Sequence, residues 1–80
     1  MSEELKPYDG TEREFLHDLC NPLAISYGNM RLLTAKLDAD INAIDPQIVL
    51  EKLHKAIKSF DKANELLDRR RTYLKSLEAA

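Results

Sequence analysis

The sequence predicts an all-α protein, an antiparallel two-helix hairpin that dimerises into a four-helix bundle. Two stretches of about 30 residues carry apolar residues at steps of three and four, which is the period of an amphipathic helix. An Asp45-Pro46 pair between them is typical of a helix start. One such hairpin cannot cover its own apolar stripes, whereas two hairpins can, with helices crossing at about 20°.

The composition describes one small soluble domain at most. The chain has 80 residues, a net charge of -2 and 44% hydrophobic residues, and a chain of this size rarely stabilises a core as a monomer. No apolar run approaches the roughly 18 residues of a membrane span, and the first residues do not resemble a signal peptide. We therefore expect a cytoplasmic protein with no membrane partner and, given its mildly acidic charge, no nucleic-acid partner. One cysteine and two histidines are too few for a tetrahedral metal site, so no metal or cofactor is expected in this chain.

The first helix is predicted over about residues 12–41. Residues 1–10 are polar and are predicted to form a flexible arm. Thr11 and Glu14 then have the spacing of a capping box. Asn42 is the predicted left-handed cap at the other end. The main apolar stripe has one polar exception, Ser26, and comprises Leu16, Leu19, Leu23, Met30, Leu33, Leu37 and Ile41.

The second helix is predicted over about residues 46–78, after a loop at about 42–45. Asp45 is a natural N-cap, and Pro46 fits the first helical position, where its missing backbone donor costs nothing. We assign residues 11–80 to a single helical hairpin. The apolar residues of this helix repeat at close to 3.5 residues and comprise Leu50, Leu53, Ile57, Phe60, Leu67, Leu74 and Leu77.

The predicted functional site lies around a proline inside the first helix. Pro22 removes one backbone hydrogen bond at a cost of about 3 kcal/mol and leaves the carbonyl of Asp18 without its helical donor. His17 and Asn21 are four residues apart and share one face of the helix, while Asp18 can reach the near side of the imidazole. We interpret this arrangement as a reactive histidine with an acid and an amide beside it, and Pro22 as a kink.

A second line of residues lies roughly opposite the main apolar stripe. Ile25, Gly28 and Leu32 continue the face that carries His17 and Asn21. Isolated exposed apolar residues are ordinary. A line of them leading from a reactive histidine fits better with a docking partner, and Gly28 would let the partner's backbone come close.

The run His17-Asp18-Leu19-Cys20-Asn21-Pro22-Leu23 closely resembles the H-box of the dimerisation and histidine-phosphotransfer domain of bacterial sensor histidine kinases. That motif reads His-Glu/Asp-Leu-x-Asn/Thr-Pro-Leu after an upstream phenylalanine. The likeness continues through Gly28-Asn29 and Leu32-Leu33, and adds Asn29 to the predicted docking residues. The resemblance implies a homodimeric helical bundle that works in two-component signalling.

The resemblance also implies a chemistry. Nε2 of His17 would accept phosphate, Asp18 would accept the proton of the other ring nitrogen, and Asn21 would orient phosphoryl oxygens or a water. The sequence offers no cation cluster, so a receiver domain would bring Mg²⁺ and a lysine. No nucleotide-binding motif follows the hairpin. We therefore expect a histidine phosphotransferase acting on receiver aspartates, with phosphatase activity as an accompanying role, and not an autonomous kinase.

Two alternatives stay open. The chain could be a non-catalytic dimeric module that binds a histidine kinase or a response regulator through the face of Ile25 and Leu32. It could also be a fragment of a full sensor kinase. His54 is interpreted as a surface or edge residue, Cys20 as a partly buried small residue, and the run Arg69-Arg70-Arg71 as a solvated helix face that favours the C-terminal dipole.

Overall fold

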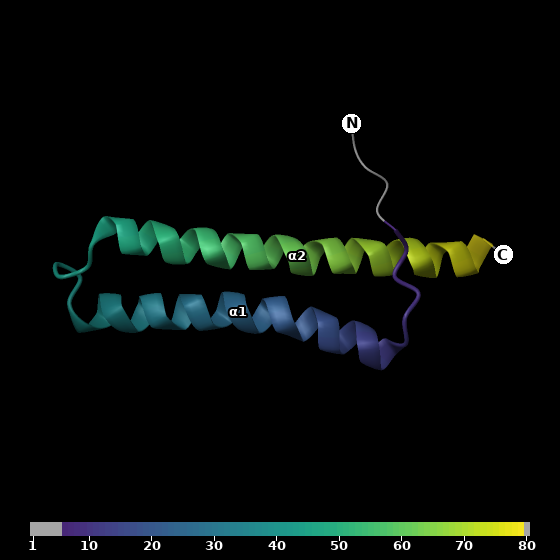
Figure 1. Cartoon of the computed structure of the whole chain (residues 1–80), viewed down its shortest axis with the longest axis horizontal. Helices are drawn as coiled ribbons and strands as arrows, with labels where there is room; N and C mark the ends of the chain where they lie inside the picture. The colour runs from purple at the N-terminus through teal and green to yellow at the C-terminus, as the bar shows by residue number, and fades with distance from the viewer. Residues whose placement is uncertain (1–5, 80) are drawn as a thin grey trace, which may run out of the picture.

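The structure is a computed structural model that describes residues 6–79, and within that range it consists of two antiparallel helices (Figure 1). Helix α1 runs over Glu12–Ala39 and helix α2 over Pro46–Ala79. The helices lie side by side, and the N-terminal part of α1 diverges from α2 (Figure 1). The prediction of an all-α helical hairpin is confirmed.

Both helix starts have the caps that the sequence predicts. The Thr11 hydroxyl accepts a hydrogen bond from the backbone N–H of Glu14 at 3.1 Å, and Oε1 of Glu14 accepts one from the backbone N–H of Thr11 at 3.3 Å. At the start of α2, Oδ1 of Asp45 accepts from the backbone N–H of Gln47 at 2.9 Å. These bonds satisfy amide groups that have no partner within the first turn of a helix.

The end of α1 differs from the prediction. The helix ends at Ala39, two residues earlier than expected, and no non-glycine residue of the described range has a positive φ, so the prediction of Asn42 as a left-handed cap is wrong. Asp40 is the C-cap, with extended backbone angles. Its carboxylate accepts a hydrogen bond from the backbone N–H of Asn42 at 3.0 Å, which favours a turn over a further helical residue.

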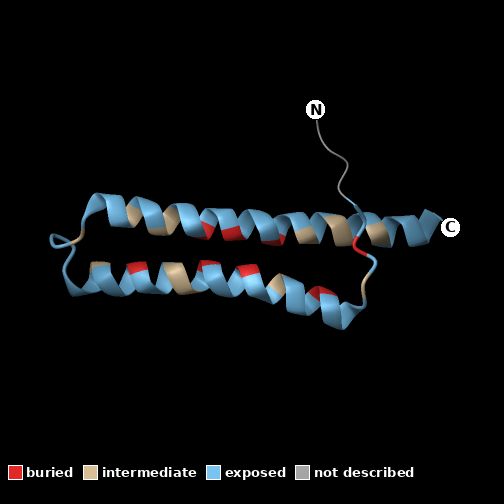
Figure 2. Ribbon diagram, in the orientation of Figure 1, coloured by how far each residue is buried: buried red, intermediate tan, exposed pale blue. Residues whose placement is uncertain are grey.

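The faces that meet between the helices are narrow and rich in small residues. Ser26 is fully buried, and its hydroxyl donates to the carbonyl oxygen of Ala56 at 2.9 Å. This contact accounts for the polar exception in the predicted stripe. The buried helical residues are Phe15, Pro22, Ser26 and Leu33 of α1 and Ala56, Ser59 and Ala63 of α2 (Figure 2).

Much of the predicted core is therefore exposed in the hairpin. Leu16 follows the buried Phe15 by one residue and Leu23 follows the buried Pro22, so each is rotated by about 100° away from α2. On α2 the apolar repeat is likewise rotated away from the buried residues. It therefore lies on the same side of the hairpin as Leu16 and Leu23. We call this side the open apolar face, and it comprises Leu16, Leu23 and Met30 of α1 and Ile57, Phe60, Leu67 and Leu74 of α2.

Neither helix within residues 6–79 combines the length and the apolar character needed to cross a membrane.

The segment before α1 contacts α2 and differs from the loose arm that the sequence suggests. The backbone N–H of Tyr8 donates to the carbonyl of Arg69 at 3.1 Å, and Nε of Arg69 donates to the carbonyl of Lys6 at 2.8 Å. Arg70 donates to the carbonyls of Tyr8 and Gly10, at 3.1 and 2.8 Å. The purple segment in Figure 1 accordingly crosses the C-terminal part of α2. Residues 1–5 of the predicted arm lie outside the described residues.

Candidate functional site

His17 lies in the second turn of α1 with its side chain 75% exposed. Its Nδ1 atom is 3.5 Å from Oδ1 of Asp18, the next residue along the chain. A neutral imidazole with its proton on Nδ1 presents that proton to the carboxylate and keeps the lone pair on Nε2. In that tautomer the free lone pair lies on Nε2, the ring nitrogen that is not directed at Asp18.

The other oxygen of Asp18 has a partner of its own. The hydroxyl of Tyr8 donates a hydrogen bond to Oδ2 of Asp18 at 2.6 Å. This hydrogen bond holds the pKa of the Asp18 carboxyl below its usual range, with smaller contributions from His17 and Arg69. Donating to Asp18 also raises the pKa of the Tyr8 hydroxyl to about 12. Asp18 is therefore a carboxylate at neutral pH, with one oxygen toward Tyr8 and the other toward His17.

Tyr8 is itself tightly packed. Its ring is buried and meets the ring of Phe15 edge to face, with the centroids 5.3 Å apart. The guanidinium carbons of Arg69 and Arg70 lie 5.5 and 6.0 Å from the centre of the Tyr8 ring. The hydroxyl that holds Asp18 is thus placed by contacts with both helices.

Asn21 and Pro22 follow the histidine within the same helix. Pro22 lies inside α1, which continues beyond it, as predicted. The ring of Pro22 is buried against α2, so this residue packs between the helices in addition to leaving the Asp18 carbonyl without a helical donor. Asn21 is exposed one turn after His17. His17 and Asn21 are thus both exposed and one helical turn apart in α1, as the sequence predicts.

A shallow groove between the helices runs beside these residues. One hollow is lined by Asn21, Pro22, Ile25, Lys58, Ser59 and Lys62. A second, which shares Pro22 and Lys62 with the first, is lined by Asp18, Pro22, Lys62, Glu65, Leu66 and Arg69. From the sequence, no cation cluster is expected at the site. Helix α2 places Lys58, Lys62 and Arg69 along the groove, together with the acidic Glu65, and His17 itself lines neither hollow.

The predicted docking residues divide into two groups. Ile25 and Leu32 are each 54% exposed, as the second line of residues predicts. Gly28 is half-buried, with nothing within 4 Å of where a Cβ would lie. Asn29 is half-buried, and its amide donates to the carbonyl of Ile25 at 2.9 Å, within its own helix. Of the four predicted docking residues, Ile25 and Leu32 are therefore the ones with exposed side chains.

The other chemically notable residues do not join the site. His54 is exposed, as expected, and Cys20 is exposed as well, so the interpretation of Cys20 as partly buried is wrong. Across residues 6–79, no three histidine, cysteine, aspartate or glutamate side chains gather in a way that could hold a metal ion.

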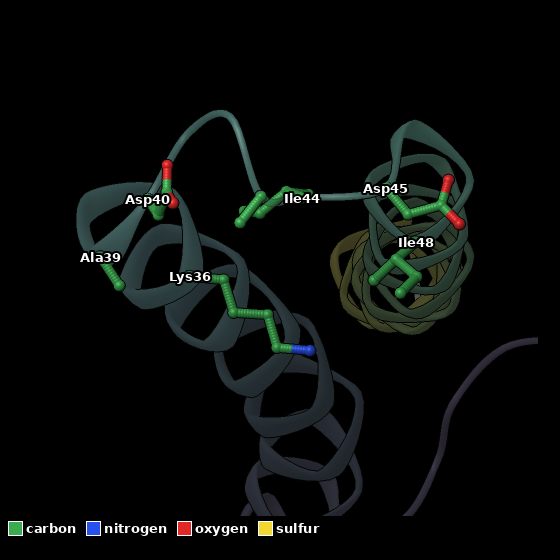
Figure 3. Close-up of a pocket in the computed structure, with 7 residues that line it drawn as sticks. Lys36, Ala39, Asp40, Ile44, Asp45 and Ile48 are labelled. Atoms are coloured by element: carbon green, nitrogen blue, oxygen red, sulfur yellow. The ribbon is translucent and has the colours of Figure 1, made fainter.

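A mostly apolar pocket lies at the opposite end of the hairpin, where the loop joins the helices. Figure 3 shows Lys36 of α1, Ile44 of the loop and Ile48 of α2 along its walls. Since His17 lies near the start of α1 and this pocket at the end of α1, the pocket is remote from the histidine.

Three residues beside the site, Tyr8, Lys58 and Lys62, were not predicted from the sequence. Tyr8 is an aromatic residue in a polar segment, which was a signal for a tertiary contact. The two lysines are four residues apart on the side of the second helix away from its apolar repeat, so the register of that repeat could have placed them together. Arg69 and Arg70 were noticed but interpreted as a solvated face, whereas both are half-buried and hold the N-terminal segment.

No family model matches the chain, and no curated protein or solved structure matches it either.

Proposed function

We propose that the chain is a dimeric histidine phosphotransferase of two-component signalling. His17 would take phosphate from the aspartyl phosphate of one receiver domain and pass it to the aspartate of another. The observation that carries the proposal is an exposed imidazole with Nδ1 3.5 Å from a carboxylate that Tyr8 holds in place. The resemblance of residues 17–23 to the H-box of sensor histidine kinases supports the same assignment.

The transfer step follows from this geometry. Nε2 of His17 attacks the phosphorus, the bond from phosphorus to the aspartyl oxygen breaks, and the receiver carboxylate leaves with that electron pair. The imidazole gains positive charge as it forms the new bond, and the adjacent carboxylate of Asp18 stabilises that charge, as in other histidine–acid pairs. The reverse sequence of bonds delivers the phosphoryl group to a second receiver.

Charge neutralisation would come from both partners. Phosphoryl transfer depends chiefly on in-line positioning and on cations near the transferred group. We propose that the receiver contributes Mg²⁺ and a lysine. Lys58 and Lys62 line the groove beside Asn21 and would draw the acidic pocket of a receiver toward this side of the hairpin.

We further propose that two copies of the chain pair through the open apolar face. The buried core of one hairpin is small, and its central residues are alanine and serine. The apolar residues of the open face repeat at steps of seven along α1 and of three and seven along α2, and a repeat of this kind suits packing of helices into a bundle. A two-fold interface uses the same patch on each copy, which one continuous face satisfies. The result would be a four-helix bundle.

The test is phosphate transfer from a panel of phosphorylated receiver domains. We expect acid-labile label on the wild type and on His54→Gln, the matched control at the other histidine, and none on His17→Gln. Loss of receiver phosphate without label, in the wild type but not in Asn21→Ala, would indicate phosphatase activity. If no receiver transfers or loses phosphate in the presence of the wild type, the proposed activity is wrong.

The exposure of Ile25 and Leu32 favours a second candidate, a module that binds and regulates a histidine kinase or a response regulator without chemistry. In that case a partner would bind the wild type and His17→Gln equally well. Leu32→Asp would abolish binding of either protein.

A further inference from the structure

We propose that Tyr8 is a positioning residue for the His17–Asp18 pair, holding the Asp18 carboxylate so that it selects Nε2 of His17 as the nucleophile. This inference rests on the proposed function, because it concerns the atom that accepts phosphate. It extends that function by giving a role to the segment before α1.

The two carboxylate oxygens of Asp18 have different partners. Oδ2 accepts the hydrogen bond from Tyr8 at 2.6 Å, and Oδ1 lies 3.5 Å from Nδ1 of His17. Adjacent residues of a helix do not normally face one another. The Asp18 side chain is also 49% exposed, so little else limits its rotation. The contact with Tyr8 is therefore what keeps the second oxygen toward the imidazole.

The position of the Tyr8 hydroxyl is set by tertiary structure and not by its neighbours in sequence. The backbone N–H of Tyr8 donates a hydrogen bond to the carbonyl of Arg69, and the backbone carbonyl of Tyr8 accepts one from the Arg70 side chain. Its ring packs edge to face on Phe15. These contacts join the N-terminal segment, the first turn of α1 and the C-terminal part of α2 at one residue, which makes Tyr8 a rigid support for the Asp18 carboxylate.

The chemical consequence concerns the histidine tautomer. A free neutral histidine side chain in water favours the proton on Nε2, which leaves the lone pair on Nδ1. A carboxylate held toward Nδ1 accepts the proton there and moves the lone pair to the exposed Nε2 atom. The same hydrogen bond lowers the pKa of Asp18, so this residue remains an ionised acceptor. Without Tyr8, His17 would revert toward the free tautomer.

The experiment compares Tyr8→Phe with Tyr27→Phe in the full chain. Tyr8→Phe keeps the ring and removes only the hydroxyl. Tyr27→Phe is the matched control, since it removes a hydroxyl that accepts from Arg31 at 3.0 Å on an exposed part of α1. Nitrogen-15 NMR of labelled histidine reports the tautomer of His17. Phosphoramidate, a small phosphate donor, reports the reactivity of His17 without a receiver. Nε2 bonds to phosphorus as the phosphorus–nitrogen bond of phosphoramidate breaks and ammonia leaves.

We expect Tyr8→Phe to shift the tautomer toward the proton on Nε2 and to slow phosphorylation by about five- to tenfold, the loss expected for one hydrogen bond. Tyr27→Phe should match the wild type in both measurements. In an Asp18→Asn background, Tyr8→Phe should have no further effect, because the residue through which it acts is gone. Circular dichroism checks that each variant keeps its helical content.

Equal tautomers and equal rates in the wild type and Tyr8→Phe would overturn the inference while leaving the proposed function in place. So would an equal effect of Tyr8→Phe in the Asp18→Asn background, since Tyr8 would then act through the fold alone. If the wild type takes phosphate from neither phosphoramidate nor any receiver, the proposed function fails. The NMR comparison still decides whether Tyr8 sets the tautomer of His17.

Discussion

Replacing Phe60 with alanine should dissociate the proposed dimer. A phenylalanine side chain presents about 200 Å² of surface, and Phe60 is 44% exposed, so each copy would bring about 90 Å² to the interface. Covering both rings at about 25 cal/mol per Å² contributes about 4.5 kcal/mol. A loss of that size weakens association by about a thousandfold.

Sedimentation equilibrium over a range of protein concentrations measures this effect. Leu32→Ala is the matched control, because it removes an exposed apolar side chain from the far side of α1, and Leu32 is 54% exposed. We expect the wild type and Leu32→Ala to have the mass of two chains at micromolar concentration, and Phe60→Ala to have that of one. A folded wild-type monomer at these concentrations would refute the reasoning, and so would an equal effect of the two substitutions.

Three further predictions concern the fold and the site. The hydrogen bond from Tyr8 to Asp18 should stabilise the fold fully below the ordinary tyrosine value of about pH 10 and lose its effect as the pH rises to about 12. Ultraviolet titration of tyrosinate should show this late ionisation, and Asp18→Asn should abolish it. Ser26→Ala should lower the free energy of unfolding by about 1 kcal/mol in chemical denaturation, since the buried bond to the Ala56 carbonyl is lost. Thr11→Ala should lower it by a similar amount, about 1 kcal/mol, through loss of the cap, in thermal unfolding at fixed protein concentration.

The sequence predicted the helices well because their signals are local. The capping box at Thr11 and the N-cap at Asp45 each depend on residues within one turn, and both form as expected. The end of α1 was predicted two residues too late. Both Asp40 and Asn42 are residue types that favour a turn after a helix, and turn propensity alone does not show which of them ends it.

The assignment of the buried face was less successful for a physical reason. Leucine and methionine at helical spacing mark an apolar stripe, but not what covers it. In the hairpin, the contact between α1 and α2 uses residues small enough for the backbones to approach, such as Ser26 and Ala56. The larger residues Leu23 and Met30 lie on the open apolar face, where a second chain would be needed to bury them.

At the site, the residues of α1 were predictable and their support was not. His17, Asp18 and Asn21 follow one another within five positions, so their spacing on a helix is fixed by its pitch. Tyr8 and Arg69 are more than 60 residues apart in the chain and meet only when the hairpin closes. No local pattern encodes such a contact, although an aromatic residue in a polar segment suggests one.

Helix α1 has three faces with different surroundings. Phe15 and Ser26 face α2, Leu23 and Met30 lie to one side on the open apolar face, and Ile25 lies to the other side. At 100° per residue, Ile25 is about 160° from the centre of the open apolar face. A second copy on that face would therefore leave Ile25 and the adjoining groove exposed, and a receiver could dock there without displacing it. Dimerisation and docking then do not compete, so each hairpin of a dimer would present its own His17.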